Sequence, residues 1–363
     1  MFKISDIYKV LNLNFKESFI NLRFLLKEGN LWGNKGYEIF SYQIKIPSDN
    51  VNFDIEFPNE EVFQISEDNN TIFVNSVSEK FQFEFDKSMG GLKKYIYKGD
   101  KLLSSPILVD FWNPLNDNER LNKIYEEIKH WKYIGKSFPY NHYEIMKSDD
   151  GCIVLKFYKT LYDLNEAKLV TTYKINSFGD INVDLLVSDL PRGVSHARSV
   201  GFKVFLPKKY DQIEFYGRGP YENYNDRKGA SKIGLYKTTI EKQFTDYIRP
   251  QRTGNLTDVR WIRFFKKDDR NSLILLNSKE NLLQVNASMY NDHEYEKTHK
   301  YQMEKFSNNI INLRSKDYGS TFETFDDTDV VEYIGENSIY RFSFIISAIN
   351  NNSSPINIWK RIV

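Results

Sequence analysis

A short polar segment near the middle of the chain has residue types suited to binding hydroxyl groups. It runs from Tyr216 to Arg227 and reads Tyr-Gly-Arg-Gly-Pro-Tyr-Glu-Asn-Tyr-Asn-Asp-Arg. Its glycines and proline favour a tight turn with a fixed backbone. Aromatic faces pack against the C–H faces of sugar rings, and short polar side chains hydrogen-bond to neighbouring hydroxyls. The segment therefore predicts a sugar-facing loop, whose candidate binding residues are Tyr221, Glu222, Asn223 and Arg227.

The same residues also have a structural interpretation. Glu222 has the residue type of a general acid or base, but that role needs a partner within hydrogen-bond reach. Buried polar groups commonly act as scaffolds, so Glu222 and the Asp226–Arg227 pair are equally suited to locking a loop between strands. His196 and His299 have the residue type for proton transfer, yet no motif around them specifies it. We therefore expect no catalytic residue in this chain.

Composition limits the classes of function. The 50 Lys+Arg and 49 Asp+Glu residues leave a net charge of +1. Such a balanced charge creates no positive electric field that would attract nucleic acid. The single cysteine, Cys152, excludes an internal disulfide, and no histidine pair has the spacing of a metal site on a helix. We expect no metal and no cofactor.

No apolar run approaches the roughly 20 residues that span a bilayer, and the start MFKISDIYKV is charged where a signal peptide would be apolar. We therefore expect a cytoplasmic protein without membrane contact.

The elements that must position the polar segment are predicted to be strands. In Phe81–Asp86, phenylalanine alternates with polar residues, which is typical of a half-buried strand. Further strands are predicted over Thr71–Val77, Cys152–Tyr158, Leu169–Ile175, Ile181–Leu186, Gly201–Leu206, Leu273–Leu276 and Tyr340–Ile346. Two stretches have helical spacing instead, Asn118–Trp131 and Tyr290–Thr298. The fold class is therefore all-β, with a large two-sheet β-sandwich.

A break in the alternation lies between Asp49 and Asn70, where prolines and acidic residues gather. We predict a partial β segment over residues 1–55, a linker with the first strand over 56–75, and one sandwich domain over 76–363. The first segment is too short to form an independent sandwich. We expect it to dock on the large domain or on a partner, and an exposed apolar face within it would favour a partner.

At this point several motifs resemble a known family. Besides the segment up to Arg227, Tyr247–Gln251 (Tyr-Ile-Arg-Pro-Gln) and Gly254–Trp261 (Gly-Asn-Leu-Thr-Asp-Val-Arg-Trp) resemble the C-terminal domain of bacterial β-galactosidases of glycoside hydrolase family 2. The motifs occur in the same order. Phe111–Trp112 and Pro114–Asp117 are similar to the start of that domain, and Arg23–Glu28, Leu31–Trp32 and Gly36–Ile39 resemble the second half of the immunoglobulin-like domain that precedes it.

This resemblance implies a two-sheet fold similar to galactose mutarotase, with loops that close one side of a sugar pocket. It implies sugar contacts from Asn116 and Asp117 at the pocket rim, and an exposed indole at Trp112 would stack on a sugar face. Arg252 and Asn255 complete the predicted substrate-binding set. The chain departs from the family in lacking a glycine hinge after Asp117 and in having Arg252 where an acidic residue is usual. It also has Thr324–Thr328 without the family's tryptophan, which either weakens the aromatic contact or passes it to Phe325.

The family's paired catalytic carboxylates lie on a (β/α)₈ barrel, which needs roughly 250 residues of alternating strands and helices that this sequence lacks. The resemblance therefore implies a non-catalytic C-terminal part or small subunit, which shapes the galactoside pocket of a barrel-bearing partner chain. The alternatives are a stand-alone carbohydrate-binding β-sandwich and a mutarotase-like aldose epimerase. Two facing carboxylates about 5 Å apart in a deep cleft, as in a retaining glycosidase, would contradict the main hypothesis.

Overall fold

The structure is a computed structural model. It describes residues 17–46, 60–121, 125–134, 139–197, 199–268, 270–278, 281–297, 299–317, 338–350 and 353–362. The chain divides into a small unit, Met1–Phe57 with Lys360–Ile362, and a large unit that comprises Pro58–Trp359 and Val363. The limits that we predicted for the domains stay a prediction.

The described part of the small unit includes one β-hairpin. Strands β1 (Ser18–Leu25) and β2 (Glu38–Ile46) pair antiparallel, with Leu22 opposite Tyr42 and Phe24 opposite Phe40. Successive side chains of a strand point to opposite faces, so these residues share one face with the Ile20–Ile44 pair. The other face is more polar: it carries the Asn21–Gln43 and Arg23–Glu38 contacts, with Phe19 and Leu25 at its two ends. The hairpin is therefore amphipathic, and in the described residues it forms a sheet of two strands.

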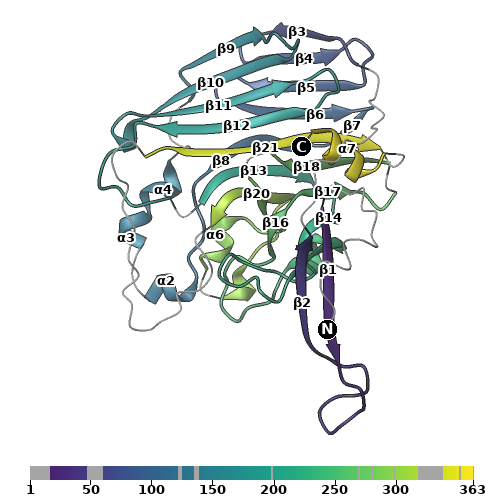
Figure 1. Cartoon of the computed structure of the whole chain (residues 1–363). Coiled ribbons are helices and arrows are strands. Elements are labelled where there is room, and N and C mark those ends of the chain that lie inside the picture. The colour runs from purple at the N-terminus through teal and green to yellow at the C-terminus, as the bar shows by residue number, and fades with distance from the viewer. Residues whose placement is uncertain are drawn as a thin grey trace. The chain divides into compact units, whose positions relative to one another are not determined.

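The large unit is built from antiparallel sheets (Figure 1). One nine-stranded sheet has the order β15-β14-β17-β18-β21-β12-β11-β10-β9. Its strands are β9 (His142–Lys147), β10 (Ile153–Leu161), β11 (Ala167–Ile175), β12 (Ile181–Ser188), β14 (Gln212–Gly219), β15 (Lys232–Thr239), β17 (Trp261–Phe265), β18 (Asn271–Asn277) and β21 (Tyr340–Asn350). A five-stranded sheet of order β3-β4-β5-β6-β7 contains β3 (Phe63–Glu67), β4 (Thr71–Ser76), β5 (Phe81–Asp86), β6 (Gly91–Tyr97) and β7 (Asp100–Lys101). A second five-stranded sheet, of order β16-β19-β20-β13-β8, contains β8 (Ser105–Asp110), β13 (Ser199–Pro207), β16 (Asn255–Val259), β19 (Leu283–Ser288) and β20 (Asn308–Asp317).

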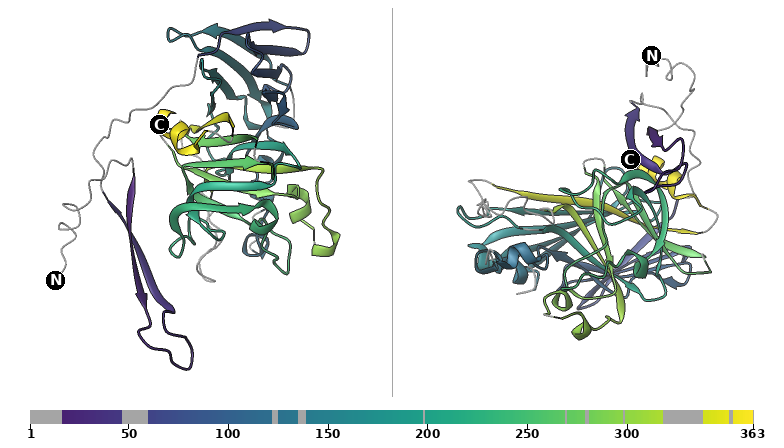
Figure 2. Two further views of the ribbon diagram at one scale, coloured as in Figure 1. Left: turned by 90° about the vertical axis from the view of Figure 1, so that its right-hand side faces the viewer. Right: turned by 90° about the horizontal axis from the view of Figure 1, so that it is seen from below.

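Both five-stranded sheets pack against the nine-stranded sheet through one apolar core (Figure 2). Phe85 of β5 contacts Phe157 of β10, with ring centroids 6.4 Å apart. Phe202 of β13 contacts Phe344 of β21 at 5.4 Å. The all-β sandwich is therefore confirmed. We expected two sheets, whereas the nine-stranded sheet packs against two separate five-stranded sheets.

The alternation of residue types explains why these strands form. In β5 the three phenylalanines of Phe81–Asp86 are buried while the polar residues between them are partly exposed, as the sequence predicted. A residue that faces the core gains apolar burial, and the next faces outward, so the pattern selects extended backbone. The other predicted strands are present as well.

Helices in the described residues are short. They are α2 (Asp117–Leu121), α3 (Tyr125–Ile128), α4 (His130–Tyr133), α5 (Ile240–Gln243), α6 (Asp292–Tyr295) and α7 (Pro355–Ile362), with 3₁₀ turns at Tyr162–Leu164 and Lys300–Gln302. Both stretches predicted as helical contain helices, namely α2 to α4 and α6. Arg120 of α2 donates a hydrogen bond of 2.8 Å to the carbonyl of Tyr295 at the end of α6. These two loop helices are therefore fixed side by side.

Candidate functional site

The polar loop after β14 is held by one buried amide. The Asn223 side chain is fully buried, and its Nδ2 donates to the carbonyls of Arg218 (3.0 Å) and Tyr221 (2.9 Å). Its Oδ1 accepts from the backbone N–H (2.9 Å) and the hydroxyl (2.5 Å) of Thr257 in β16. The backbone N–H of Asn223 donates to Asn255 O (2.8 Å), and Nδ2 of Asn255 donates to Asn223 O (2.9 Å). Both asparagines therefore fasten the loop to the edge of a sheet.

Glu222 lies beside this anchor and binds groups of two other loop segments. Its Oε2 accepts from the Gly254 N–H at 2.7 Å, and its Oε1 accepts from the hydroxyl of Tyr247 and from Arg227 Nη2 at 3.0 Å. Burial raises the pKa of Tyr247, and its hydrogen bond to the carboxylate raises it further. Because donors of the chain occupy both oxygens, the geometry favours the structural interpretation of Glu222 over general acid–base chemistry. Arg227 forms its ion pair with this carboxylate.

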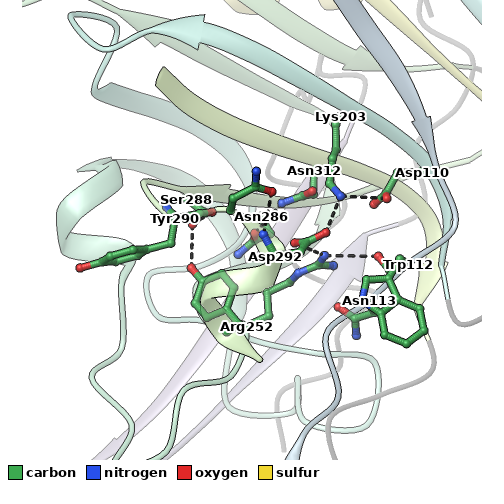
Figure 3. A network of polar contacts seen from close by, with 12 residues as sticks. Asp110, Trp112, Asn113, Lys203, Arg252, Asn286, Ser288, Tyr290, Asp292 and Asn312 are labelled. Carbon is green, nitrogen blue, oxygen red and sulfur yellow. Dashed lines mark hydrogen bonds and ion pairs between the residues drawn. The ribbon is translucent and has the colours of Figure 1, made fainter. Parts of the chain in front are cut away.

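Figure 3 shows a buried charge cluster around Lys203 and Asp292. Tyr224 of the loop donates a hydrogen bond to the carbonyl of Arg252, a member of this cluster. Lys203 Nζ donates to Asp110 Oδ1 at 2.9 Å and to Asp292 Oδ2, while Arg252 Nη2 donates to Asp292 Oδ1 at 2.8 Å and to Trp112 O at 3.3 Å. Burial opposes the charge on Lys203, but the two carboxylates outweigh it and raise the pKa of the ammonium group. Burial likewise opposes ionisation of Asp292, but Lys203 and Arg252 hold its pKa well below the usual range. The two acids and two bases balance, so the cluster adds no net charge.

This cluster bears on the predicted role of Arg252. We expected the arginine to reverse a charge at a position facing the pocket. Its side chain is instead buried, and it pairs with Asp292. Asp110 and Asp292 are two carboxylates within one cluster, and Lys203 binds both of them. A glycosidase acid must hold a proton near neutral pH, whereas the pKa of Asp292 is lowered. The arrangement is that of a buried ion-pair network.

A row of polar side chains continues from the cluster across the β16-β19-β20-β13-β8 sheet. The registers place Asn255 opposite Asn286, Asn286 opposite Asn312, and Asn312 opposite Lys203. Asn312 Nδ2 donates to Asn286 Oδ1 at 2.9 Å. Within the described ranges, Oδ1 of Asn255, Oδ1 of Asn312 and Oδ2 of Asp110 are buried without a hydrogen-bond partner. Buried acceptors of this kind commonly bind ordered water.

Sequence reasoning missed this row, although a signal for it exists. Asn286, Asn312 and Lys203 each occupy the outward position of a strand whose alternate residues are apolar. Polar residues at such positions predict only that one face of the strand points away from the apolar core. Whether loops cover that face depends on the tertiary structure.

Asn116 precedes helix α2, which begins at Asp117. The Glu119 N–H donates to Asn116 Oδ1 and the Asn116 N–H donates to Glu119 Oε2, both at 2.9 Å, which forms a capping box. Asp117 is half-exposed and forms ion pairs with Arg120 at 3.2 Å and with Arg249 at 3.3 Å. Asn116 is therefore a helix cap, and Asp117 connects helix α2 to the Tyr247–Gln251 segment through Arg249.

Trp112 lies in the core and not at an exposed position where its indole would stack on a sugar. The side chain is 1% exposed and packs with Leu115 and Ile128. Its Nε1 donates to Glu296 at 2.9 Å, and Lys132 Nζ lies 5.4 Å from the ring centroid. The apolar neighbours and the paired N–H explain the burial, since tryptophan favours a site that satisfies both its ring and its nitrogen.

The structure brings the predicted segments together but gives their side chains different surroundings. Those exposed to solvent are Asp117, Tyr221 and Arg227. Those buried or partly buried, with contacts to the chain itself, are Trp112, Asn116, Glu222, Asn223, Arg252 and Asn255. Sugar contact by any of them stays a prediction. Thr324–Thr328, which includes Phe325, lies outside the described residues.

The two histidines considered for proton transfer are not joined to Glu222. His196 Nδ1 lies 2.9 Å from the hydroxyl of Tyr340, and the His299 ring stacks on Tyr301. In the part of the chain that the structure describes, no group of three or more His, Cys, Asp or Glu side chains is arranged to hold a metal ion. Among the same residues, no helix has the length and apolar character needed to cross a membrane.

Fold and site together define an all-β sandwich in which polar loops cover one polar sheet face. A family model described as β-galactosidase small chain matches residues 77–346. The chain belongs to this family.

Curated relatives named β-galactosidase are similar to the chain. One from Priestia megaterium is 26% identical over 258 residues, which is 71% of this chain and 24% of the relative. One from Lactobacillus delbrueckii subsp. bulgaricus is 30% identical over 61% of this chain and 22% of the relative. One from Streptococcus thermophilus is 21% identical over 94% of this chain and 33% of the relative. The chain thus spans between 22% and 33% of the length of these relatives.

Among solved structures, a galactose 1-epimerase from Lactobacillus acidophilus matches with a TM-score of 0.43 and 8% identity, over 80% of this chain and 99% of that chain. A galactose mutarotase-like protein from Lactobacillus casei matches with a TM-score of 0.41 and 10% identity, over 79% of this chain and all of the other.

Proposed function

We propose that this chain is the non-catalytic C-terminal part or small subunit of a β-galactosidase. In this proposal its loops shape the galactoside pocket of a partner chain that carries the catalytic barrel. The family match and the share of the relatives that the chain spans support a larger enzyme context.

The observation that carries the proposal is that the β1–β2 hairpin is a two-stranded sheet with one apolar face, formed by the Phe24–Phe40 and Leu22–Tyr42 pairs. An isolated two-stranded hairpin is marginally stable in water, and additional strands or a packed face are needed for stability. Contiguous exposed apolar side chains mark an interaction site. The hairpin therefore fits a role as part of a domain that the partner chain completes.

The solvent-facing residues of the loops support the pocket-shaping part. Tyr221 is 80% exposed, while the backbone beneath it is fixed by Asn223. Asp117 and Arg227 are partly exposed, and each forms an ion pair, with Arg120 and Glu222 respectively. A rigid loop with an aromatic ring and charged groups at its surface suits a pocket rim, because little ordering entropy is lost on binding. The buried predicted residues would then act by holding this rim in place.

The test is an activity assay with a chromogenic β-galactoside. We expect no turnover by the purified chain, and turnover after mixing with a barrel-bearing chain encoded by the same genome. Each chain alone is the control for the mixture. Robust turnover by this chain unaided, or a barrel-bearing chain that is fully active and gains nothing from mixing, would overturn the proposal.

A further inference from the structure

The outer face of the nine-stranded sheet contains a hollow of about 350 Å³. Thr172 of β11, Asp184 of β12 and Ser343 of β21 lie opposite one another in register, and Leu186 pairs with Arg341 in a neighbouring row. The alternate residues of these strands belong to the apolar core. The five side chains therefore point away from the core, and they line the hollow.

Asn281 adds a further group to the lining, from the connection between β18 and β19. At the inner wall, the hydroxyls of Ser343 and Ser278 lie 2.6 Å apart, and both residues are buried. This contact fixes the Ser343 hydroxyl. Side chains of the sheet therefore form the base of the hollow, and the segment between β18 and β19 forms one side of it.

Several polar groups of the hollow are available to a ligand. Counting only described residues, no hydrogen bond or ion pair involves the guanidinium group of Arg341, the amide of Asn281 or the hydroxyl of Thr172. Asp184 accepts a hydrogen bond from Asn182, which orients its carboxylate. Donors from three different segments therefore converge around an oriented acceptor.

The charges of the lining limit the chemistry of the ligand. Asp184 would repel a phosphate or another anion, and Arg341 would repel a cation. Carboxylate, amide and guanidinium groups together bind neighbouring hydroxyls as paired donors and acceptors, and Leu186 offers an aliphatic surface for C–H groups. Small-molecule pockets measure about 300–1,000 Å³. The hollow lies at the lower end of that range, which fits one or two sugar rings.

We infer that this hollow is a binding site for a neutral sugar, with Arg341, Asp184, Asn281 and Thr172 as its polar contacts. The site is formed by β11, β12 and β21 and contains none of the residues of the polar loops. It therefore stands independently of the proposed function.

The experiment is calorimetric titration of the full chain with D-galactose and, in parallel, with D-glucose. We expect saturable heat from at least one of the two sugars. Arg341→Met and Thr172→Val should each weaken the binding, the first by at least tenfold. Arg270→Met is the matched control, because Arg270 is exposed and lies outside the hollow. Among the residues that the structure describes, it forms only a long ion pair with Asp268. Its affinity should equal that of the unmodified chain.

Three outcomes would overturn the inference. The first is the absence of saturable heat with both sugars. The second is sugar binding that Arg341→Met and Thr172→Val leave unchanged, which would place the sugar elsewhere. The third is saturable binding of glycine with no response to either sugar, which would assign the Asp184 and Arg341 charges to a zwitterion. Circular dichroism of each variant confirms that it is folded before titration.

Discussion

Asn223 and Asn255 hydrogen-bond to each other in both directions, from backbone N–H to carbonyl at 2.8 Å and from side-chain amide to carbonyl at 2.9 Å. The pair joins a loop to a strand more than thirty residues further along the chain. These hydrogen bonds hold the backbone of the loop that we interpreted as sugar-facing. Exposed residues of the loop, such as Tyr221, therefore project to solvent from a fixed backbone.

Removing the Asn223 side chain should destabilise the large unit strongly. Asn223→Ala leaves two carbonyls and two Thr257 donors without partners in a fully buried position. Each unsatisfied buried group costs about 1–3 kcal/mol, so we expect the free energy of unfolding to fall by about 3 kcal/mol or more. Urea denaturation measures this change. Tyr221→Ala, at an exposed position of the same loop, should change stability by no more than about 0.5 kcal/mol.

Acid should weaken the fold through Asp292. Its pKa is held below the usual value of 3.8 by Lys203 and Arg252, after burial is overcome. A carboxyl group whose folded-state pKa is lowered stabilises the fold above its unfolded pKa, and this stabilisation is lost as the pH falls through the folded-state value. We therefore expect the unfolding free energy to decrease below about pH 4.

Asp292→Asn tests the same cluster at neutral pH. It leaves Lys203 and Arg252 with a single buried carboxylate, Asp110, and breaking a buried ion pair costs about 3–5 kcal/mol. The variant should also lose the part of the acid dependence that Asp292 causes. Asp246→Asn is the control, because Asp246 pairs with Lys300 on the surface and such pairs contribute at most about 1 kcal/mol. Equal stability of the two variants would show that the buried cluster is not stabilising.

Lys203 should produce the opposite dependence at high pH. Its pKa is raised above 10.5 because Asp110 and Asp292 outweigh the effect of burial. Its stabilising contribution is complete below the unfolded pKa and is lost as the pH rises through the folded-state value. Lys203→Met should therefore remove the cluster's alkaline transition, as followed by tryptophan fluorescence.

The hairpin offers a matched pair of substitutions in β2. Phe40 lies on the apolar face, and Ser41 lies on the polar face. Phe40→Asp places a charge where a partner's apolar surface would pack, whereas Ser41→Asp adds the same charge to the solvated face. We expect Phe40→Asp to abolish activation of a barrel-bearing chain and Ser41→Asp to preserve it. If both variants activate equally, the apolar face is not the docking surface.

Glu222 should control the order of the segment that follows β15 and α5. Glu222→Ala removes the acceptor of the Gly254 N–H and of the Tyr247 hydroxyl. A hydrogen bond to a charged group contributes about 1.5–3 kcal/mol, so amide exchange at Gly254 should become about tenfold to a hundredfold faster. Hydrogen–deuterium exchange measures this. Glu241→Ala, at an exposed position, should leave the rate unchanged, and an unchanged rate in Glu222→Ala would contradict the structural role.

The pattern of residue types along the chain predicts some features of this protein, and the packing of distant segments decides others. The alternation in Phe81–Asp86 was sufficient to predict β5, because a half-buried strand needs only its own residues to define two faces. The motifs that recur in one order, among them Gly217–Arg227, Tyr247–Gln251 and Gly254–Trp261, were sufficient to identify the family, whose model matches residues 77–346. Neither observation required knowledge of the strand order.

Other features depend on which strands become neighbours. Lys203 and Asp292 are 89 residues apart and meet only because β13 lies within the sheet that the α6 loop covers. Trp112 illustrates the same limit: its motif left open whether the ring is exposed, and packing against Leu115 and Ile128 buries it. The sequence by itself determined the strands, the family and the polar loop. The tertiary structure decided which polar side chains are buried and paired, because those contacts join segments whose separation along the chain carries no local signal.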